Sequence, residues 1–294
     1  VVGLFLAYHW AYLMLGGTFS TMLVVKWVLT GVIIISLGIK AKQMYDLQHD
    51  FTEHYKATVL PLIINKLDQK LTFNPKGEIA QAHFENAGVF PVYEKILYFG
   101  SNLVTGSFNR GSYMFSETTI KVYEKRKNRK GVESTFMLDL FGGLFYVAAF
   151  NQAFSGKTVV YSNKTRKNPS TLNADKISTM PNFADTQLVK PENLAFNEAF
   201  TVYSNNQTEA QKILTPTFTR LLLQFQQQLN HEITIAFLKN RVYIFIANEQ
   251  RILEPYILKP LNTAEQFQPI IDVISGLIEI GEELNFNTRI WTTE

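Results

Sequence analysis

Two apolar runs dominate the start of the chain. Residues 1–15 and 21–39 are almost wholly apolar, and the segment between them, 16–20, carries no charge. As a helix rising 1.5 Å per residue, the second run would extend about 28 Å, close to the hydrocarbon thickness of a membrane. The alternatives are a buried core helix and a cleaved signal peptide, but a signal peptide is one short run, whereas here a longer run follows at once. The pattern predicts a two-helix transmembrane hairpin over residues 1–39.

Basic residues set the expected orientation. Lys40 and Lys42 follow the second run immediately, whereas the loop between the two runs has no basic residue. Positively charged flanks stay on the cytoplasmic side of a membrane, so we expect the long C-terminal part of the chain in the cytoplasm. Lys26 lies about one turn into the second run, where its long side chain would extend toward the membrane surface.

A helical period continues beyond the second run. From residue 40 to about residue 71, apolar residues recur every three or four positions, and Pro61 is expected to kink or divide the helix. With a short helix that ends before Gly88, this gives an expected helical stalk over residues 40–90. Its apolar stripe either packs on its own domain or contacts a partner or a second copy of the chain. The residues expected to make that contact are Met44, Leu47, Phe51 and Tyr55.

Alternation of apolar and polar positions predominates from about residue 98. Strand-like runs occupy 103–108, 113–125 and 134–150, with a basic tip between the last two and a second arm expected to begin near Val132. A further strand is expected through residues 158–162, and a hairpin that turns at Lys239 and Asn240. These runs predict an antiparallel sheet.

Helices are expected to cover that sheet. Helical patterns occupy 207–214, the segment after Thr215 and residues 263–281. Thr215 suits the N-cap, and Pro216 suits the first helical position. The predicted fold is therefore α+β: the hairpin over 1–39, the stalk over 40–90, and an antiparallel β-rich domain with covering helices over 91–294.

The composition narrows the range of functions and cellular compartments that the chain could have. The chain has 294 residues, 28 basic and 25 acidic residues with a formal net charge of +3, and no cysteine. The charge is mild and spread along the chain, so we expect no nucleic-acid partner. Without cysteines there is no disulfide framework, and therefore no requirement for an oxidising compartment. The roughly 250 residues after the hairpin are enough for a proper core.

The sequence contains none of the common catalytic motifs, so it names no reaction and we expect no cofactor and no metal. His49 and His54 lie near carboxylates on a predicted helix, but an exposed polar face explains them better than metal ligation. The segment 156–158 ends like a phosphate-binding loop but lacks the upstream glycine. Gly142 lies between strand-like arms, where a bulge or tight bend is a commoner use of glycine than close approach to a ligand.

Two basic segments are candidates for contact with anionic lipid. Near an anionic leaflet, each basic residue adds about 1 kcal/mol of attraction, whereas the alternative is a solvated loop tip. The residues concerned are Lys125, Arg126, Lys127, Arg129, Lys130, Lys164, Arg166 and Lys167. The second group lies in a loop over residues 163–182 that has no clear periodicity and is expected to be mobile.

Five segments together resemble one known family. They are residues 100–106, 141–145, 150–158, 196–204 and 209–216, in that order. The chain is similar, from about residue 51 to 280, to the bacterial membrane family catalogued as domain of unknown function three-one-three-seven. That resemblance implies a pair of N-terminal spans, a cytoplasmic domain and no assigned activity or catalytic residues. Many relatives have Asp where this chain has Asn206. The segments 150–154 and 196–200 are alike, but so short a match is better explained by chance than by duplication.

These observations predict a function without catalysis. We expect a membrane-anchored scaffold or partner-binding component of a bacterial envelope or stress system, at the inner membrane. Its expected partners are membrane lipids and either further copies of the chain or another membrane protein. The alternative is an enzyme or small-ligand receptor with a pocket in the β-rich domain around Gly142 and Phe145. A deep polar pocket there would favour the alternative, and a packed sheet face would oppose it.

Overall fold

The structure is a computed structural model of the chain. It describes residues 10, 14, 19–109, 111–127, 131, 133–151, 153–163, 177, 179–248, 251–255 and 267–287. The chain divides into two compact units, Val1–Tyr55 and Lys56–Glu294.

In the described part of the N-terminal unit, residues 19–54 form one long helix, α2 (Phe19–His54). The helical segment Lys26–Leu67 is the one segment of the described residues that is long and apolar enough to cross a membrane, and its most apolar window is not buried. This agrees with the expected second span. The first expected span, residues 1–15, lies outside the described residues except for Trp10 and Met14, so the hairpin stays a prediction.

The helical segment after α2 is interrupted where proline predicted a break. A π-helical turn, η1 (Tyr55–Val59), precedes the short helix α3 (Leu60–Leu67), which has Pro61 in its first turn. Proline has no N–H to donate, and its ring crowds the preceding turn, which the wider π turn accommodates. The sequence predicted that Pro61 would kink or divide the helix; the structure shows a π-helical turn just before Pro61, within a helical segment that continues to Leu67.

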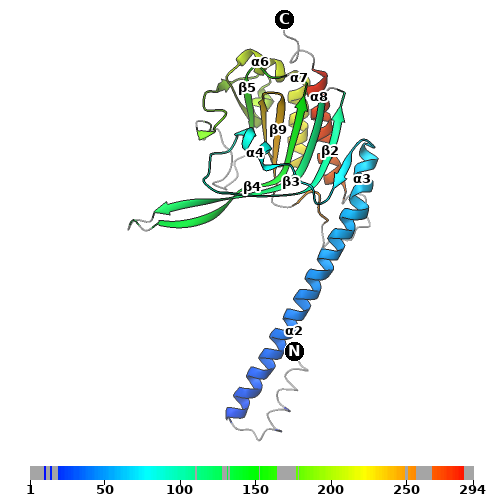
Figure 1. The fold of residues 1–294 in the computed structure, drawn as a ribbon, viewed down its shortest axis with the longest axis vertical. Helices are drawn as coiled ribbons and strands as arrows, with labels where there is room; N and C mark the ends of the chain where they lie inside the picture. Colours follow the sequence, from blue (N-terminus) through cyan, green and yellow to red (C-terminus); the bar gives the residue numbers. More distant parts are fainter. Residues whose placement is uncertain are drawn as a thin grey trace. The chain divides into compact units, whose positions relative to one another are not determined.

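The described residues of the C-terminal unit form a nine-stranded antiparallel sheet at its centre (Figure 1). The strands lie in the order β1-β2-β3-β4-β9-β8-β5-β7-β6. Their bounds are β1 (Thr72–Asn74), β2 (Ile96–Phe108), β3 (Gly111–Lys127), β4 (Glu133–Phe150), β5 (Lys157–Ser162), β6 (Gln187–Val189), β7 (Phe200–Ser204), β8 (Glu232–Leu238) and β9 (Arg241–Ala247). The predicted antiparallel sheet and the mixed α+β fold are confirmed.

Both faces of the sheet are covered. Helices α7 (Pro216–Leu229) and α8 (Gln268–Phe286) lie together behind the sheet in Figure 1. On the opposite face, α4 (Gln81–Ala87) and the chain that follows it place Phe84 and Phe90 against Phe245. Two short helices, α5 (Leu194–Ala199) and α6 (Gln207–Ile213), flank β7 along the chain.

The central strands β8 and β9 are buried on both faces. Ala236 and Phe245 are as deeply buried as Ile235 and Ile244, the residues next to them on the other face. The reason is that helices on one side and the α4 segment on the other exclude water from both faces.

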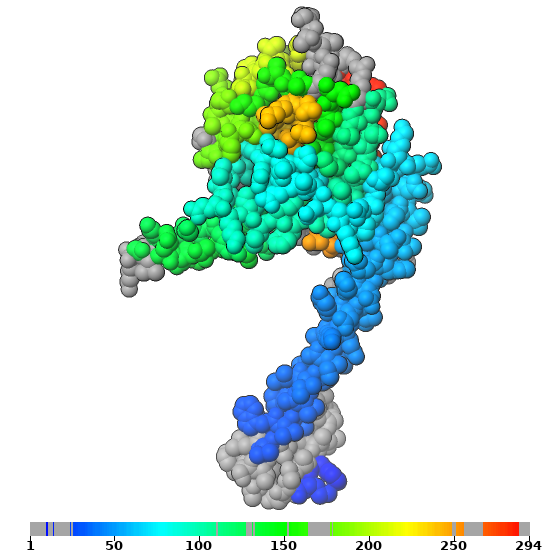
Figure 2. Space-filling view, viewed as in Figure 1, coloured from blue at the N-terminus to red at the C-terminus, as the bar shows by residue number. Residues whose placement is uncertain are grey.

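Strands β3 and β4 continue beyond their neighbours as a two-stranded arm (Figures 1 and 2). Strand β2 begins to pair with β3 at Val122, and β9 pairs with β4 only from Gly143 onward. The arm therefore consists of residues 123–127 paired with residues 133–137. Two of its apolar side chains are exposed: Phe136 by 46% and Met137 by 53%.

Candidate functional site

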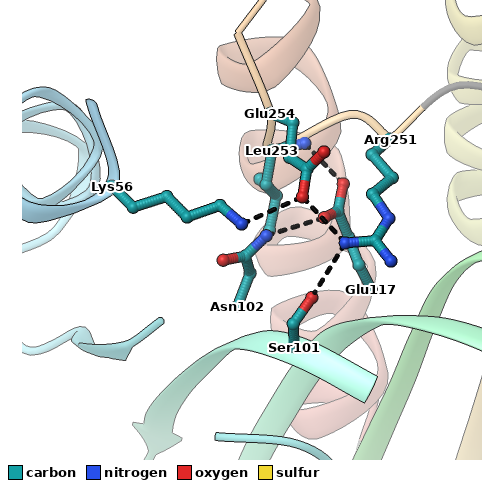
Figure 3. Close-up of polar contacts among 7 residues, drawn as sticks. All are labelled: Lys56, Ser101, Asn102, Glu117, Arg251, Leu253 and Glu254. Carbon is teal, nitrogen blue, oxygen red and sulfur yellow. Dashed lines mark hydrogen bonds and ion pairs between the residues drawn. The ribbon is translucent and has the colours of Figure 1, made fainter. Parts of the chain in front are cut away.

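A buried polar cluster joins three distant segments of the C-terminal unit (Figure 3). Glu117 on β3 is 4% exposed, and its two carboxylate oxygens accept hydrogen bonds from the Leu253 N–H and the Asn102 amide, each at 2.7 Å. Asn102 lies at a bulge in β2, has a left-handed φ of 58° and donates its own N–H to the Pro75 carbonyl at 3.0 Å. A carboxylate that is removed from water in this way needs such donors.

The environment shifts the proton affinity of Glu117. Burial raises its pKa above the ordinary range, and the nearby Glu254 carboxylate adds to this effect. The hydrogen bonds from Leu253 and Asn102 and the charge of Arg251 act in the opposite direction, but the net shift is upward.

The second carboxylate of the cluster is held by two cations. The Glu254 carboxylate accepts from the Lys56 ammonium at 2.9 Å and from the Arg251 guanidinium at 2.7 Å. Burial alone would raise the pKa of Glu254, but these hydrogen bonds outweigh burial, and the net shift is downward. Arg251 also reaches the Ser101 hydroxyl at 3.5 Å. The cluster thus contains two acids and two bases, which is typical of a structural network that fixes segment 251–254 between the sheet and Lys56.

A second polar cluster joins two of the segments that carry the family resemblance. Glu209, on α6, accepts hydrogen bonds from the Ser155 N–H at 2.6 Å, the Ser155 hydroxyl at 2.9 Å and the Gly156 N–H at 2.7 Å. Asn206, the N-cap of α6, donates to the Ser155 hydroxyl at 3.1 Å. In segment 156–158, the chain's own side chains therefore accept the first two backbone N–H groups: Glu209 accepts from Gly156, and the Asn205 amide oxygen accepts from Lys157 at 2.7 Å.

A polar pocket of about 440 Å³ adjoins this second cluster. Its lining residues come from the end of α4, the start of β5, the end of β7 and the β8–β9 turn. They are Glu85, Asn86, Phe154, Ser155, Gly156, Lys157, Asn182, Asn205, Leu238 and Lys239. Sequence reasoning missed this pocket because no motif links these positions.

The pocket does not lie where the sequence placed it, around Gly142 and Phe145. Phe145 is fully buried and stacks on Phe245 with ring centroids 4.5 Å apart. A packed sheet face therefore occupies that position. Gly143 has a φ of 149°, and a side chain there would meet the Ile246 carbonyl, so Gly143 serves close strand packing.

The other predicted contact residues fall into two groups. Lys125, Arg126 and Lys127 lie exposed on the arm, where Lys125 pairs with Glu94 and Arg126 with Glu124. Outside the described residues lie Arg129, Lys130, Lys164, Arg166 and Lys167, together with most of the loop expected to be mobile.

The apolar stripe is exposed on α2 except at its end. Met44 is 59% exposed, Leu47 68% and Phe51 37%, whereas Tyr55, in η1, is buried. His49 and His54 are exposed on the same helix. Within the described residues, no group of three or more potential metal ligands comes together.

Comparison with family models agrees with the resemblance. The family model described as "Protein of unknown function (DUF3137)" matches residues 139–286, which is 148 of the 294 residues and just over half of the chain. No curated protein is significantly similar to the sequence. Among solved structures, the chain is similar to the mycobacterial trehalose monomycolate transport factor A, TtfA, with 9% identity over 79% of this chain and 96% of that chain and a TM-score of 0.37. On the strength of the family match, the chain belongs to the DUF3137 family.

Proposed function

We propose that this protein is a membrane-anchored scaffold or partner-binding component of a bacterial envelope or stress system, and that it performs no catalysis. The observation that carries the proposal is the exposed apolar stripe Met44, Leu47 and Phe51, which lies beyond the predicted span 21–39 but on the same helical segment, Lys26–Leu67, that is apolar enough to cross a membrane. These residues have the three-and-four spacing of a helix–helix seam, and burying them against another helix removes apolar surface from water. The partner is a second copy of the chain or another membrane protein.

The anchoring has two parts in this proposal. Residues 1–39 span the inner membrane as a hairpin, and Lys40 and Lys42 keep the C-terminal unit in the cytoplasm. The basic tip of the β3–β4 arm and the basic loop after β5 then contact anionic lipid headgroups. Exposure of Lys125, Arg126 and Lys127 supports this contact.

Gentle detergent extraction of the full chain, followed by sizing and mass spectrometry, tests the proposal. We expect an assembly larger than one chain, and a shift to monomer when Met44, Leu47 and Phe51 are all changed to Ser. A variant with Lys42→Ser and His49→Ser, on the other face of α2, should keep the size of the wild type. A strictly monomeric wild-type protein that copurifies with nothing would refute the scaffold.

The second candidate function is a small-ligand receptor. The polar pocket beside Ser155 favours it, because its volume falls within the range of small-molecule sites, about 300–1,000 Å³. It differs from the earlier expectation in position, since it lies at the start of β5 rather than around Gly142.

A further inference from the structure

The hydrogen-bond donors in the lining of the pocket at the start of β5 indicate which kind of ligand it could bind. Several of its polar groups already donate within the protein: the Ser155 hydroxyl to Glu209 at 2.9 Å, the Asn182 amide to the Asn86 carbonyl at 2.9 Å, and the Asn205 amide to Asp185 at 3.3 Å. A neutral ligand such as a sugar would therefore meet few available donors. The ammonium groups of Lys157 and Lys239 are the strongest donors of its lining.

Lys239 occupies a position that suits lysine poorly. It begins the two-residue turn between β8 and β9 with a left-handed φ of 56°. Turns of this type favour Asn or Gly, and other side chains there cost about 1 kcal/mol. The backbone is held in place because the Lys239 carbonyl accepts the Phe154 N–H at 2.6 Å. Backbone strain of this kind is typical of functional positions. At this strained position, the exposed side chain of Lys239 contributes its ammonium group to the pocket lining.

Lys157 is available to a ligand despite its ion pair. Its ammonium lies 2.9 Å from Asp185, whose side chain is 56% exposed. A pair so open to water is weak, and an ammonium has three donors, so Lys157 can also bind an anion in the pocket. Glu85 is the opposing charge in the lining, and it is exposed and accepts from Gln81.

Two ammonium groups on separate elements match a dianion, because each can donate to a different oxygen. We propose that this pocket binds a small ligand through a phosphate monoester group, which Lys239 and Lys157 hold above the apolar side chains of Phe154 and Leu238. The phosphate belongs either to a water-soluble ester or to a lipid headgroup. This site does not depend on the proposed scaffold function, since none of its residues lies on α2.

The test uses calorimetric titration of the full chain in a non-ionic detergent. One arm titrates glycerol 3-phosphate, and the other titrates dihexanoyl phosphatidic acid below its micelle concentration. The key variant is Lys239→Asn, which removes the charge but places a favoured residue at the left-handed turn, so the fold should be kept or stabilised. Lys190→Asn removes an exposed lysine outside the pocket lining and is the matched control.

We expect saturable binding of at least one probe, weakened about tenfold or more by Lys239→Asn and unchanged by Lys190→Asn. Glu85→Gln should tighten binding, because it removes the opposing charge. Binding of glycerol 3-phosphate identifies a soluble ester as the ligand class, whereas binding of the phosphatidic acid alone identifies a lipid headgroup. The proposal is overturned if neither probe binds saturably, or if Lys239→Asn and Lys190→Asn weaken binding equally.

Discussion

Glu117 is a carboxylate placed where water does not reach it. Its hydrogen bonds to the Leu253 N–H and the Asn102 amide connect positions 136 and 15 residues away in the sequence. Burial still raises its pKa, so these two donors compensate only in part for lost hydration. The buried Oδ1 of Asn102 has no hydrogen-bond partner within the described residues.

The raised pKa of Glu117 predicts a pH-dependent stability. Between the ordinary glutamate pKa of about 4.5 and its raised folded value, the folded chain binds more protons than the unfolded chain. The contribution of Glu117 to the free energy of unfolding therefore decreases as the pH rises through this window, by at most about 1.4 kcal/mol per pH unit. In Glu117→Gln this decrease should be absent, so the variant gains stability relative to wild type as the pH rises. Urea unfolding of the full chain in detergent, from pH 4.5 to pH 8, measures the difference.

Glu117→Gln should still fold, because its amide oxygen accepts from Leu253 and a reoriented Asn102 can present Oδ1 to the new NH₂ group. Glu279→Gln, at an exposed position of α8, is the control and should keep the wild-type pH dependence. Identical pH profiles for wild type and Glu117→Gln would contradict this explanation.

At Gly143, the backbone of β4 lies so close to the backbone of residues 246–248 that only glycine fits. At Gly143 the φ is 149°, and an added Cβ would meet the Ile246 carbonyl and the Asn248 N–H. Gly142→Ala would instead place its Cβ no nearer than 3.7 Å to the Asn248 carbonyl. We expect Gly143→Ala to lower the free energy of unfolding by about 2 kcal/mol or more, and Gly142→Ala to leave it within about 0.5 kcal/mol. Thermal unfolding of the two variants side by side measures this, and equal losses would show that strand packing is not the reason for Gly143.

Local chemistry explains which elements could be predicted from the sequence. The Thr215 hydroxyl accepts the Phe218 N–H at 3.1 Å as the N-cap of α7, and α4 ends at Gly88 in a left-handed conformation. The β8–β9 turn forms at Lys239 and Asn240 as expected. Each of these depends on a few consecutive residues, so the sequence alone contains the signal.

The features that could not be predicted from the sequence depend on contacts between residues far apart in the chain. The position of β9 between β4 and β8 and the burial of both faces of β8 depend on contacts across the whole unit. Neither polar cluster has a sequence signature, because its members are far apart in the chain. The likeness of segments 150–154 and 196–200 has no structural counterpart: Phe150 ends a strand, whereas 194–199 is the helix α5.

The proposed function requires α2 to act both as an anchor and as a contact surface. The helical segment Lys26–Leu67 is long and apolar enough to cross a membrane, and the stripe Met44, Leu47 and Phe51 on it is exposed within the described structure. The proposed function requires a partner on this stripe, either a second copy of the chain or another membrane protein, and pairing of two copies is the case that crosslinking tests. The absence of cysteine from the chain makes it directly testable, because one introduced thiol is the sole reactive position.

The most direct measurement is oxidative crosslinking of single-cysteine variants in native membranes. Leu47→Cys places a thiol on the stripe, and His49→Cys places one about 160° around the same helix, at a similarly exposed position. If two copies pair through the stripe, we expect a disulfide-linked dimer for Leu47→Cys and none for His49→Cys. No dimer from Leu47→Cys, or equal amounts from both variants, would contradict pairing of two chains through α2.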